Sequence, residues 1–385
     1  MEYRLDELFD LQMGKTPSRN NPEYWNSKDH KWISIADLSK CGKYISETKE
    51  YLSDKAVKES GISVIPANTV IMSFKLSIGK TAITAEPMFS NEAIMSFRDL
   101  RKIDLLPDYL YYLFSGKEWD EGTNKAVLGK TLNKATLSQV QIKVHSFSEQ
   151  KKIVKTLDKV SSIIDSRRRE LQALDDLIKA RFVEMFGDII HNDRGWNTFY
   201  FSDVTTSRLG KMLDSKQQTG KHSFPYLANY NVQWFRFEIS NLNQMDFGEE
   251  DQKEFQLLDG DLLVCEGGEI GRCAVWHNQV QPCFFQKALH RVRCNQKVLL
   301  PDYLAWWFKF NCDNKGFASI EGAKATIAHL PGAKLKQLNV VVPPIELQNE
   351  FVSLVKQVEK SKLAVQKALN QSQLLFDSLM QKYFG

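Results

Sequence analysis

The chain of 385 residues contains an internal repeat, and this repeat limits its possible folds more than any other feature. The dipeptide Phe186-Gly187 closes the first half and recurs as Phe384-Gly385, at an offset of 198 residues (187 to 385). Leu106-Pro107-Asp108-Tyr109-Leu110 recurs as Leu300-Pro301-Asp302-Tyr303-Leu304, at an offset of 194 (106 to 300). Solenoid repeats are far shorter, at about 20–50 residues, so this period indicates a duplicated domain. The sequence therefore predicts two related halves with pseudo-two-fold symmetry.

Each half ends in an apolar stripe whose spacing alternates between four and three residues, as in a coiled-coil seam. A strict stripe of this length is unusual for a helix in a globular core. Because a whole domain lies between the stripes, we predict that they form two long helices that pair with each other antiparallel. The alternative is that each helix packs only on its own half. The predicted seam residues are Ile153, Leu157, Val160, Leu171, Leu174, Ile178, Phe351, Val355, Val358, Val365, Leu369 and Phe376.

The predicted fold class is α+β, with two pseudo-symmetric α/β domains separated by an antiparallel coiled coil. Residues 1–147 and 188–345 mix short β-rich runs with turns and are the predicted domains. Residues 148–187 and 346–385 are the predicted helices. Expected local features are strands at 32–35, 70–74 and 81–84, a helix start at Pro107, an N-cap at Ser148 and a C-cap at Gly187.

Composition places the chain among ordinary globular proteins. It is 43% hydrophobic and 25% charged, with a net charge of +4, and no apolar run approaches the length of a membrane span. The first residues, Met1–Asp6, do not resemble a signal peptide. None of the six cysteines forms a C-x-x-C pair, so we expect reduced thiols, a cytoplasmic location and no membrane association.

Sequence motifs for catalysis are missing. Gly79-Lys80-Thr81 resembles the end of a phosphate-binding loop, but the glycine required upstream is Phe74. Pro343-Pro344 lacks the flanking residues of an amino-methylation motif, and the histidines lack metal-ligand spacing. We therefore expect no catalytic residues, no metal and no cofactor.

Two glycine-bearing loops instead suggest a binding surface. Lys75–Lys80 and Glu266–Arg272 each lie between strand signals, and their glycines allow close approach of the backbone. Amide and guanidinium side chains at nearly equivalent places can read base edges in the major groove, and lysines can bind phosphates. The candidate DNA-binding residues are Lys15, Lys75, Ser77, Lys80, Asn91, Lys130, Lys134, Lys211, Glu266, Arg272, Gln286, Lys287 and Lys324.

The order of these blocks, twice over nearly the whole chain, resembles the specificity subunit of Type I restriction-modification enzymes. The Ile-Gly-Lys/Arg loops, the Leu-Pro-Asp-Tyr-Leu blocks, Glu149-Gln150, Pro343-Pro344 with Gln348, and the Phe-Gly endings carry the resemblance. It implies two target-recognition domains held apart by two antiparallel helices, each domain reading one part of a split, asymmetric sequence in double-stranded DNA. It also implies a non-catalytic subunit whose partners are two modification subunits, which methylate adenine, and ATP-dependent restriction subunits, which cleave.

Two other functions are compatible with the same layout. A protein-assembly scaffold could carry two globular domains on a coiled-coil strut, but its two binding faces would be alike, whereas Asn20–Trp25 has no counterpart after Gly210-Lys211. A fragment of a single-chain restriction-methylation enzyme would need the methyl-transfer motifs that this sequence lacks.

Overall fold

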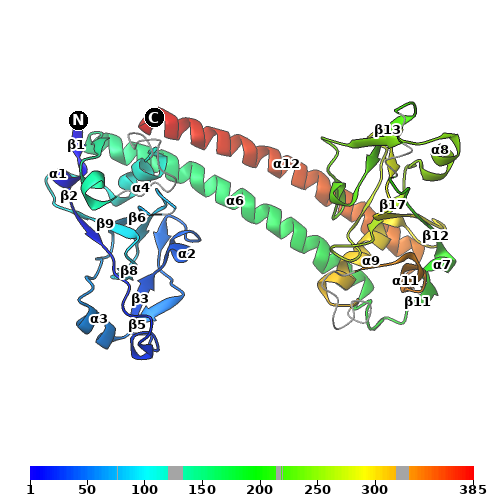
Figure 1. Cartoon of the computed structure of the whole chain (residues 1–385), viewed down its shortest axis with the longest axis horizontal. Helices are drawn as coiled ribbons and strands as arrows, with labels where there is room; N and C mark the ends of the chain where they lie inside the picture. The colour runs from blue at the N-terminus through cyan, green and yellow to red at the C-terminus, as the bar shows by residue number, and fades with distance from the viewer. Residues whose placement is uncertain (76, 120–132, 214–217, 219, 318–328) are drawn as a thin grey trace. The chain divides into compact units, whose positions relative to one another are not determined.

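The structure is a computed structural model that describes residues 1–75, 77–119, 133–213, 218, 220–317 and 329–385. The chain forms two compact units, Met1–Arg169 with Gln366–Gly385 and Glu170–Val365. The boundaries fall inside two long helices, so each unit combines one half of the repeat with a segment of each helix (Figure 1). The predicted domain boundaries follow the helix ends rather than these units, and they stay a prediction.

The first unit contains a five-stranded sheet with the order β2-β9-β6-β7-β4. Its strands are β2 (Phe9–Met13), β9 (Ile94–Asp99), β6 (Val70–Ser73), β7 (Thr81–Thr84) and β4 (Tyr44–Ile45). A three-stranded sheet has the order β5-β3-β8, from Glu50–Leu52, His30–Ile33 and Phe89–Ser90. Strand β1 (Glu2–Arg4) pairs with β10 (Gln141–Lys143).

The central strands of the larger sheet are buried on both faces, because side chains alternate across a strand. Met72 and Phe97 lie in the apolar cluster that also contains residues of α4 (Pro107–Gly116). Ile71 and Ile94 lie in a different cluster. The sheet therefore separates two apolar layers, one of which includes the helices.

The second unit repeats this topology. Its four-stranded sheet, β12-β20-β17-β18, comprises Thr205–Leu209, Leu289–Cys294, Leu262–Cys265 and Cys273–Val275. A three-stranded sheet, β16-β13-β19, comprises Asn243–Asp246, Ser223–Leu227 and Phe284–Phe285. Strand β11 (Asn197–Tyr200) pairs with β21 (Asn339–Val342), and β14 (Val232–Gln233) pairs with β15 (Arg236–Phe237).

The short helices also recur in matched places. They are α1 (Leu5–Leu8) and α7 (Phe201–Val204), α3 (Asp54–Ser60) and α8 (Glu249–Phe255), α4 and α9 (Pro301–Asp313), and α5 (Lys134–Ser138) and α11 (Gly332–Lys336). The first half also has α2 (Ile35–Leu38) and η1 (Pro22–Tyr24), and the second has η3 (Asn229–Asn231). The duplication and the α+β fold class are confirmed.

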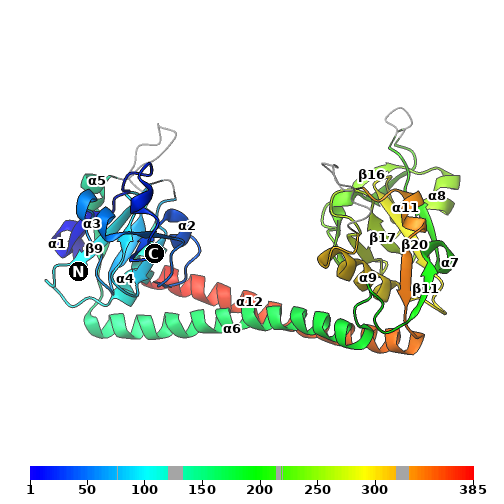
Figure 2. The same cartoon turned by 90° about the horizontal axis from the view of Figure 1, so that it is seen from below.

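The two long helices are α6 (Phe147–Phe186) and α12 (Ile345–Phe384), of 40 residues each, and both are unbroken in Figure 2. The predicted N-cap of α6, Ser148, is wrong, because this residue lies inside the helix. Ser146 caps it instead: its backbone N–H donates to Glu149 Oε2 at 3.0 Å, and the Glu149 N–H donates to Ser146 Oγ at 3.4 Å. Gly187 ends α6 with φ of +74°, as predicted.

The ends of the long helices take part in the domain cores. In the first unit, Ile153 near the start of α6 belongs to the same cluster as Phe376 near the end of α12. In the second unit, Ile178 near the end of α6 packs with Phe351 near the start of α12. Within each unit the helices therefore run in opposite directions, and they also complete the core of their half. Ile153, Leu157, Val160, Ile178, Phe351, Val358 and Val365 are buried, and Leu171, Leu174, Val355, Leu369 and Phe376 are half-buried.

One polar residue interrupts the apolar stripe of α12 in the second unit. The ammonium group of Lys362 lies 2.7 Å from Asp175 and 2.8 Å from Glu359. Burial alone would lower the pKa of Lys362, but the hydrogen bonds to the two carboxylates outweigh it and raise the pKa. The lysine stays charged in this position because its partners replace water.

A buried glutamine joins each long helix to its half. Gln150 Oε1 accepts from the backbone N–H of Leu106 at 3.1 Å, and its Nε2 donates to the carbonyls of Asp104 and His145. Gln348 makes the same set of hydrogen bonds. Its Oε1 accepts from the backbone N–H of Leu300 at 2.9 Å, and its Nε2 donates to the carbonyls of Val298 and Pro343. The side chains are 1% and 0% exposed, so these amides satisfy backbone groups that water cannot reach.

We expect Gln348→Ala to lower the free energy of unfolding by about 1–3 kcal/mol, because it leaves a buried N–H and two carbonyls without their partner. Gln357→Ala changes an exposed glutamine of the same helix and serves as the control. Chemical denaturation of the full chain measures both. Equal, small losses would show that the buried amide is not a stabilising link.

Candidate nucleic-acid interface

Four chain segments meet in the first half at the ends of β2, β3, β6 and β8, and we call this meeting point the junction. Backbone hydrogen bonds form its frame. They run from Lys15 N to Ser90 O (2.8 Å), from Asn91 N to Ile33 O (3.0 Å) and from Phe74 N to Ala93 O (3.0 Å).

The second half forms the same junction with different residues. The bonds run from Lys211 N to Phe285 O (3.2 Å), from Gln286 N to Leu227 O (3.1 Å) and from Glu266 N to Ala288 O (3.0 Å). Lys15 is therefore equivalent to Lys211, and Asn91 to Gln286, as the spacing predicts for the amides. Since the bonds are between backbone groups, the frame tolerates different side chains.

Glycine is required where the segments come closest. A Cβ atom on Gly14 would lie 2.1 Å from Ser90 O, and one on Gly210 would lie 2.3 Å from Gln286 O. Real Cβ atoms do not approach backbone oxygens this closely, so another residue would push the junction apart.

The two glycine-bearing loops are hairpin turns, β6–β7 and β17–β18. Gly79 and Gly271 have φ of +88° and +76°, and a Cβ on either would lie 2.9 Å from an aromatic atom, of Trp119 or Phe308. The loops thus rest on the aromatic layer of each half, which fixes where Lys80 and Arg272 emerge.

The cations of the two loops have different surroundings. Lys80 is exposed, and its ammonium has no ion pair among the residues described by the structure. Arg272 is half-buried, and its Nη2 donates to the backbone carbonyl of Asn229 at 3.1 Å and to its Oδ1 at 2.6 Å. Arg272 therefore anchors the η3 turn, in addition to any contact with a ligand.

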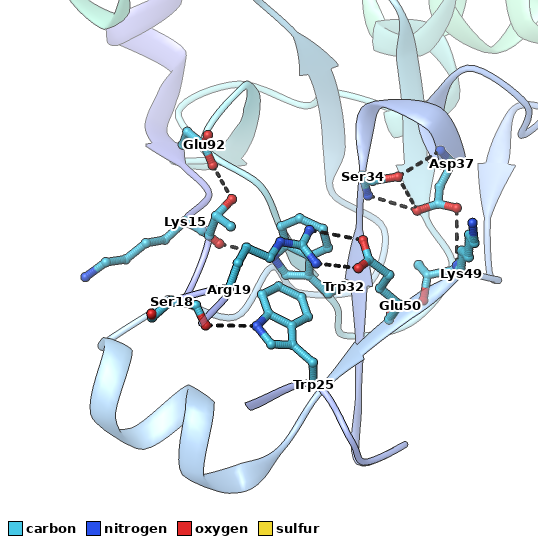
Figure 3. Close-up of polar contacts among 12 residues, drawn as sticks. Lys15, Ser18, Arg19, Trp25, Trp32, Ser34, Asp37, Lys49, Glu50 and Glu92 are labelled. Carbon is cyan, nitrogen blue, oxygen red and sulfur yellow. Dashed lines mark hydrogen bonds and ion pairs between the residues drawn. The ribbon is translucent and has the colours of Figure 1, made fainter. Parts of the chain in front are cut away.

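The junction lysines differ in the same way. The Lys15 side chain is exposed and, in Figure 3, points away from Trp25 and Trp32; its ammonium donates to the carbonyl of Ser60. The Lys211 side chain is 17% exposed, and its ammonium lies 2.6 Å from both Asp251 Oδ2 and Asp246 O. The internal partners of Lys211 reduce its capacity to bind a phosphate.

The equivalent amides also keep different hydrogen-bonding groups available. Asn91 Oδ1 accepts from the backbone N–H of Ala93 at 3.0 Å, which uses one of its lone pairs. The Gln286 side-chain amide has no such bond in the described part of the chain and is half-buried. Both remain chemically able to read adenine, which requires one donor and one acceptor.

Sequence reasoning missed a clamp in the first half, shown in Figure 3. The Arg19 guanidinium forms a two-pronged ion pair with Glu50 and lies 3.8 Å from the centre of the Trp25 ring. Trp25 donates to Ser18 O at 3.1 Å, and Trp32 donates to Lys15 O at 3.0 Å. The clamp orders the segment after Lys15, the one that the sequence identified only as unmatched.

Charges gather beside this segment. Glu92 accepts a hydrogen bond from Thr16, and this bond, together with the positive charges of Lys75 and Arg19, lowers the pKa of the carboxyl despite partial burial. Lys75 also lies 5.3 Å from the Phe74 ring centre. Lys75 and Arg19 therefore lie close enough to Glu92 to favour its ionised form.

The remaining predicted residues are more scattered. Ser77 is half-buried in the β6–β7 loop, and Glu266 is half-buried at the junction of the second half. Lys134, on α5, and Lys287, beside Gln286, are exposed. Lys130 and Lys324 lie outside the described residues.

The described ranges contain neither a cluster of three or more His, Cys, Asp or Glu side chains suited to a metal ion nor a helix of the length and apolarity that a bilayer crossing needs. The candidate residues carry amide, hydroxyl, carboxylate and cationic groups. Such groups bind phosphates and base edges.

Comparison with known proteins identifies the family of the chain. The family model for the Type I restriction modification DNA specificity domain matches residues 1–175 and 193–372. The chain belongs to this family. It is a specificity subunit, a non-catalytic component that determines the DNA target sequence, and as such it is part of a larger complex. A protein-assembly scaffold and an enzyme fragment are thereby set aside.

One relative matches nearly the whole chain, and another matches a shorter part of it. The Type I restriction enzyme MjaIX specificity subunit of Methanocaldococcus jannaschii is 22% identical over 98% of this chain and 91% of its own length. The EcoprrI specificity subunit of Escherichia coli is 30% identical over 30% of this chain and 29% of its own.

Solved structures share the fold. The S subunit from M. genitalium has a TM-score of 0.57 at 13% identity, covering 100% of this chain and 96% of its own. A chain from a structural study of complex assembly and conformational transition in the type I system has a TM-score of 0.64 at 15% identity, covering 100% and 97%.

Substituting Gly14 by alanine is expected to lower the free energy of unfolding by about 1–3 kcal/mol, the usual cost of forcing an extra carbon into a packed site. Gly42→Ala is the control, since a Cβ there meets nothing within 4 Å and φ is not positive. Thermal melts of the specificity subunit compare the two. If Gly14→Ala and Gly42→Ala unfold at the same temperature, the close approach at the junction does not require a glycine.

Proposed function

We propose that each half of this specificity subunit reads one part of a split, asymmetric DNA sequence. The observation that carries the proposal is that one backbone frame is built twice with different side chains on it. Lys80 stands where the second half has Arg272, Asn91 where it has Gln286, and an exposed Lys15 where it has a paired Lys211. Two readers on a common frame suit two different half-sites.

The side chains at and beside the two junctions have the chemistry that such reading needs. Arg272 and the amides of Asn91 and Gln286 can make paired hydrogen bonds to base edges. Lys80 can donate to a guanine edge. The lysines at positions 15, 75, 134 and 287 can bind phosphates, which positions the protein on the duplex without reading sequence. Ser77 and Glu266, which flank these groups, can accept or donate at base edges.

The partners belong to the same proposal. We infer that two modification subunits join the chain and methylate adenine, and that restriction subunits join them to cleave in an ATP-dependent way. Adenine inside a duplex must be flipped out before methylation, a task for a catalytic partner since this subunit is non-catalytic. The complex would act on chromosomal DNA in the cytoplasm.

Sequencing of methylated sites in a host that carries variants of this subunit tests whether each half of the chain reads its own half-site. Lys80→Ala is expected to weaken or relax one half-site only, and Arg272→Ala the other; a lost base contact costs about 1–3 kcal/mol. Matched controls are Lys102→Ala and Lys297→Ala. Both are exposed lysines that follow the last residues of β9 and β20, at the ends of these strands away from the junctions.

Arg272 also anchors Asn229, so a thermal melt of the Arg272→Ala variant must accompany the sequencing. Simultaneous loss of both half-sites from a stable variant would contradict the assignment of one half-site to each half.

DNA affinity of the complete modification complex is expected to fall steeply as salt rises from low to moderate concentration. Each phosphate that a lysine neutralises releases condensed counterions, so the logarithm of the binding constant falls linearly with the logarithm of salt concentration. The Lys15→Ala variant should show a shallower slope, by about one ion or less. A flat response in the unaltered complex would exclude phosphate contacts as a main source of affinity.

A further inference from the structure

A groove of about 710 Å³ lies within the second unit, away from the junction residues. Its walls come from α6, α12, α9 and the turn between β14 and β15. Pockets of about 300–1,000 Å³ are typical of small-molecule sites. Nothing in the proposed reading of DNA uses this groove.

The first half closes the equivalent place with its own side chain. The Lys43 ammonium lies 2.5 Å from Asp108 and 2.6 Å from Asp158, and 4.8 Å from the Tyr112 ring centre. Tyr44 donates to the same Asp108 at 2.7 Å, and burial first, then this bond, raise the pKa of Tyr44 to about 12. This place in the first half is therefore filled by an internal ion cluster.

The residues of the second half that correspond to this cluster, found from the offsets of the repeat, line the groove instead. Asp302 stands for Asp108, Trp306 for Tyr112 and Lys356 for Asp158, so one of the two carboxylates that hold Lys43 is replaced by a lysine. The place that an ionic contact fills in the first half is therefore an open groove in the second half.

The aromatic wall of the groove is held in an unusual conformation. Phe235 has φ of +62°, which is rare for a bulky residue, and its ring stacks on Trp306 at 4.4 Å between centres. Its side chain remains 38% exposed. Trp234 lies beside it, with the Lys309 ammonium 5.0 Å from its ring centre. Such strain is found where the surrounding structure requires it, often at binding sites.

The charges of the groove fall into two groups. Lys362 lies between Asp175 and Glu359, and this group keeps one net negative charge. Lys309 pairs with Asp313, and Arg236 pairs with Glu238. Lys179 on α6, Lys356 on α12 and Asp302 on α9 line the groove and have no ion pair or hydrogen bond among the described side chains. An aromatic surface is thus accompanied by two available ammonium groups and one carboxylate.

We propose that this groove binds a nucleoside phosphate. A planar base stacks on the exposed face of Phe235, as bases do on aromatic side chains of nucleic-acid-binding proteins. The phosphates are held by Lys179 and Lys356, and the Asp302 carboxylate accepts from ribose hydroxyls, as acidic residues do in dinucleotide sites. The groove of the first half, filled by Lys43, does not bind this ligand.

Isothermal titration calorimetry of the DNA-free, full-length chain tests the proposal with ATP, adenosine and tripolyphosphate as probes. We expect one saturable ATP site, with adenosine and tripolyphosphate each binding about tenfold or more weakly, since each supplies only part of the ligand. The double variant Lys179→Ala/Lys356→Ala should lose about tenfold or more in ATP affinity and leave adenosine binding unchanged.

Two further variants make the result specific. Phe235→Gly removes the ring while accepting the positive φ, and it should weaken ATP and adenosine alike. Lys360→Ala, an exposed lysine one turn from Lys356 and outside the groove, should change neither. Absence of saturable ATP binding at millimolar concentration, or equal losses in Lys360→Ala and the double variant, would overturn the proposal. Either result would leave the DNA-reading function untouched, because that rests on other residues.

Discussion

Each half of the molecule depends on one buried amide that connects a long helix to three backbone groups. Gln150 and Gln348 lie near the starts of α6 and α12, where chain segments arrive from the sheet and from the loop before α4 or α9. Backbone groups buried without partners are costly, so the amide decides where the helix can sit. The helix in turn adds Ile153 or Phe351 to the apolar layer under the sheet. Sheet, loops and junction take their places from that layer.

The junctions show how a duplicated frame can carry different functions. Their hydrogen bonds join backbone atoms, and glycines occupy the closest approaches, so the identities of neighbouring side chains matter little to the fold. Lys15 and Lys211 occupy equivalent positions, yet one is exposed and the other is paired with Asp251. Divergence has therefore acted on charge and exposure while the backbone geometry was kept.

Much of the fold was predictable because it follows from periodicity and repetition, both of which are local or countable. The heptad stripes, the hairpins around Gly79 and Gly271, and the Gly187 cap were all legible in this way. The cap at Ser146 was missed because Ser148 offers the same hydroxyl, and only the Glu149 contact distinguishes them. The Arg19 clamp and the Lys211 ion pair join residues 31 and 40 positions apart, and no local pattern reveals such contacts.

Gln150 and Gln348 occupy the same position in α6 and α12, and this has a genetic consequence. Both helices have 40 residues, and their starts and ends are separated by the same 198 positions. A crossover between the two coding segments at corresponding codons of the helices would keep the reading frame and the heptad phase. It would also deliver a complete glutamine link to the recombinant half. Unequal recombination within one gene could thus duplicate or exchange a reading half in a single event, without the gradual refitting of a core.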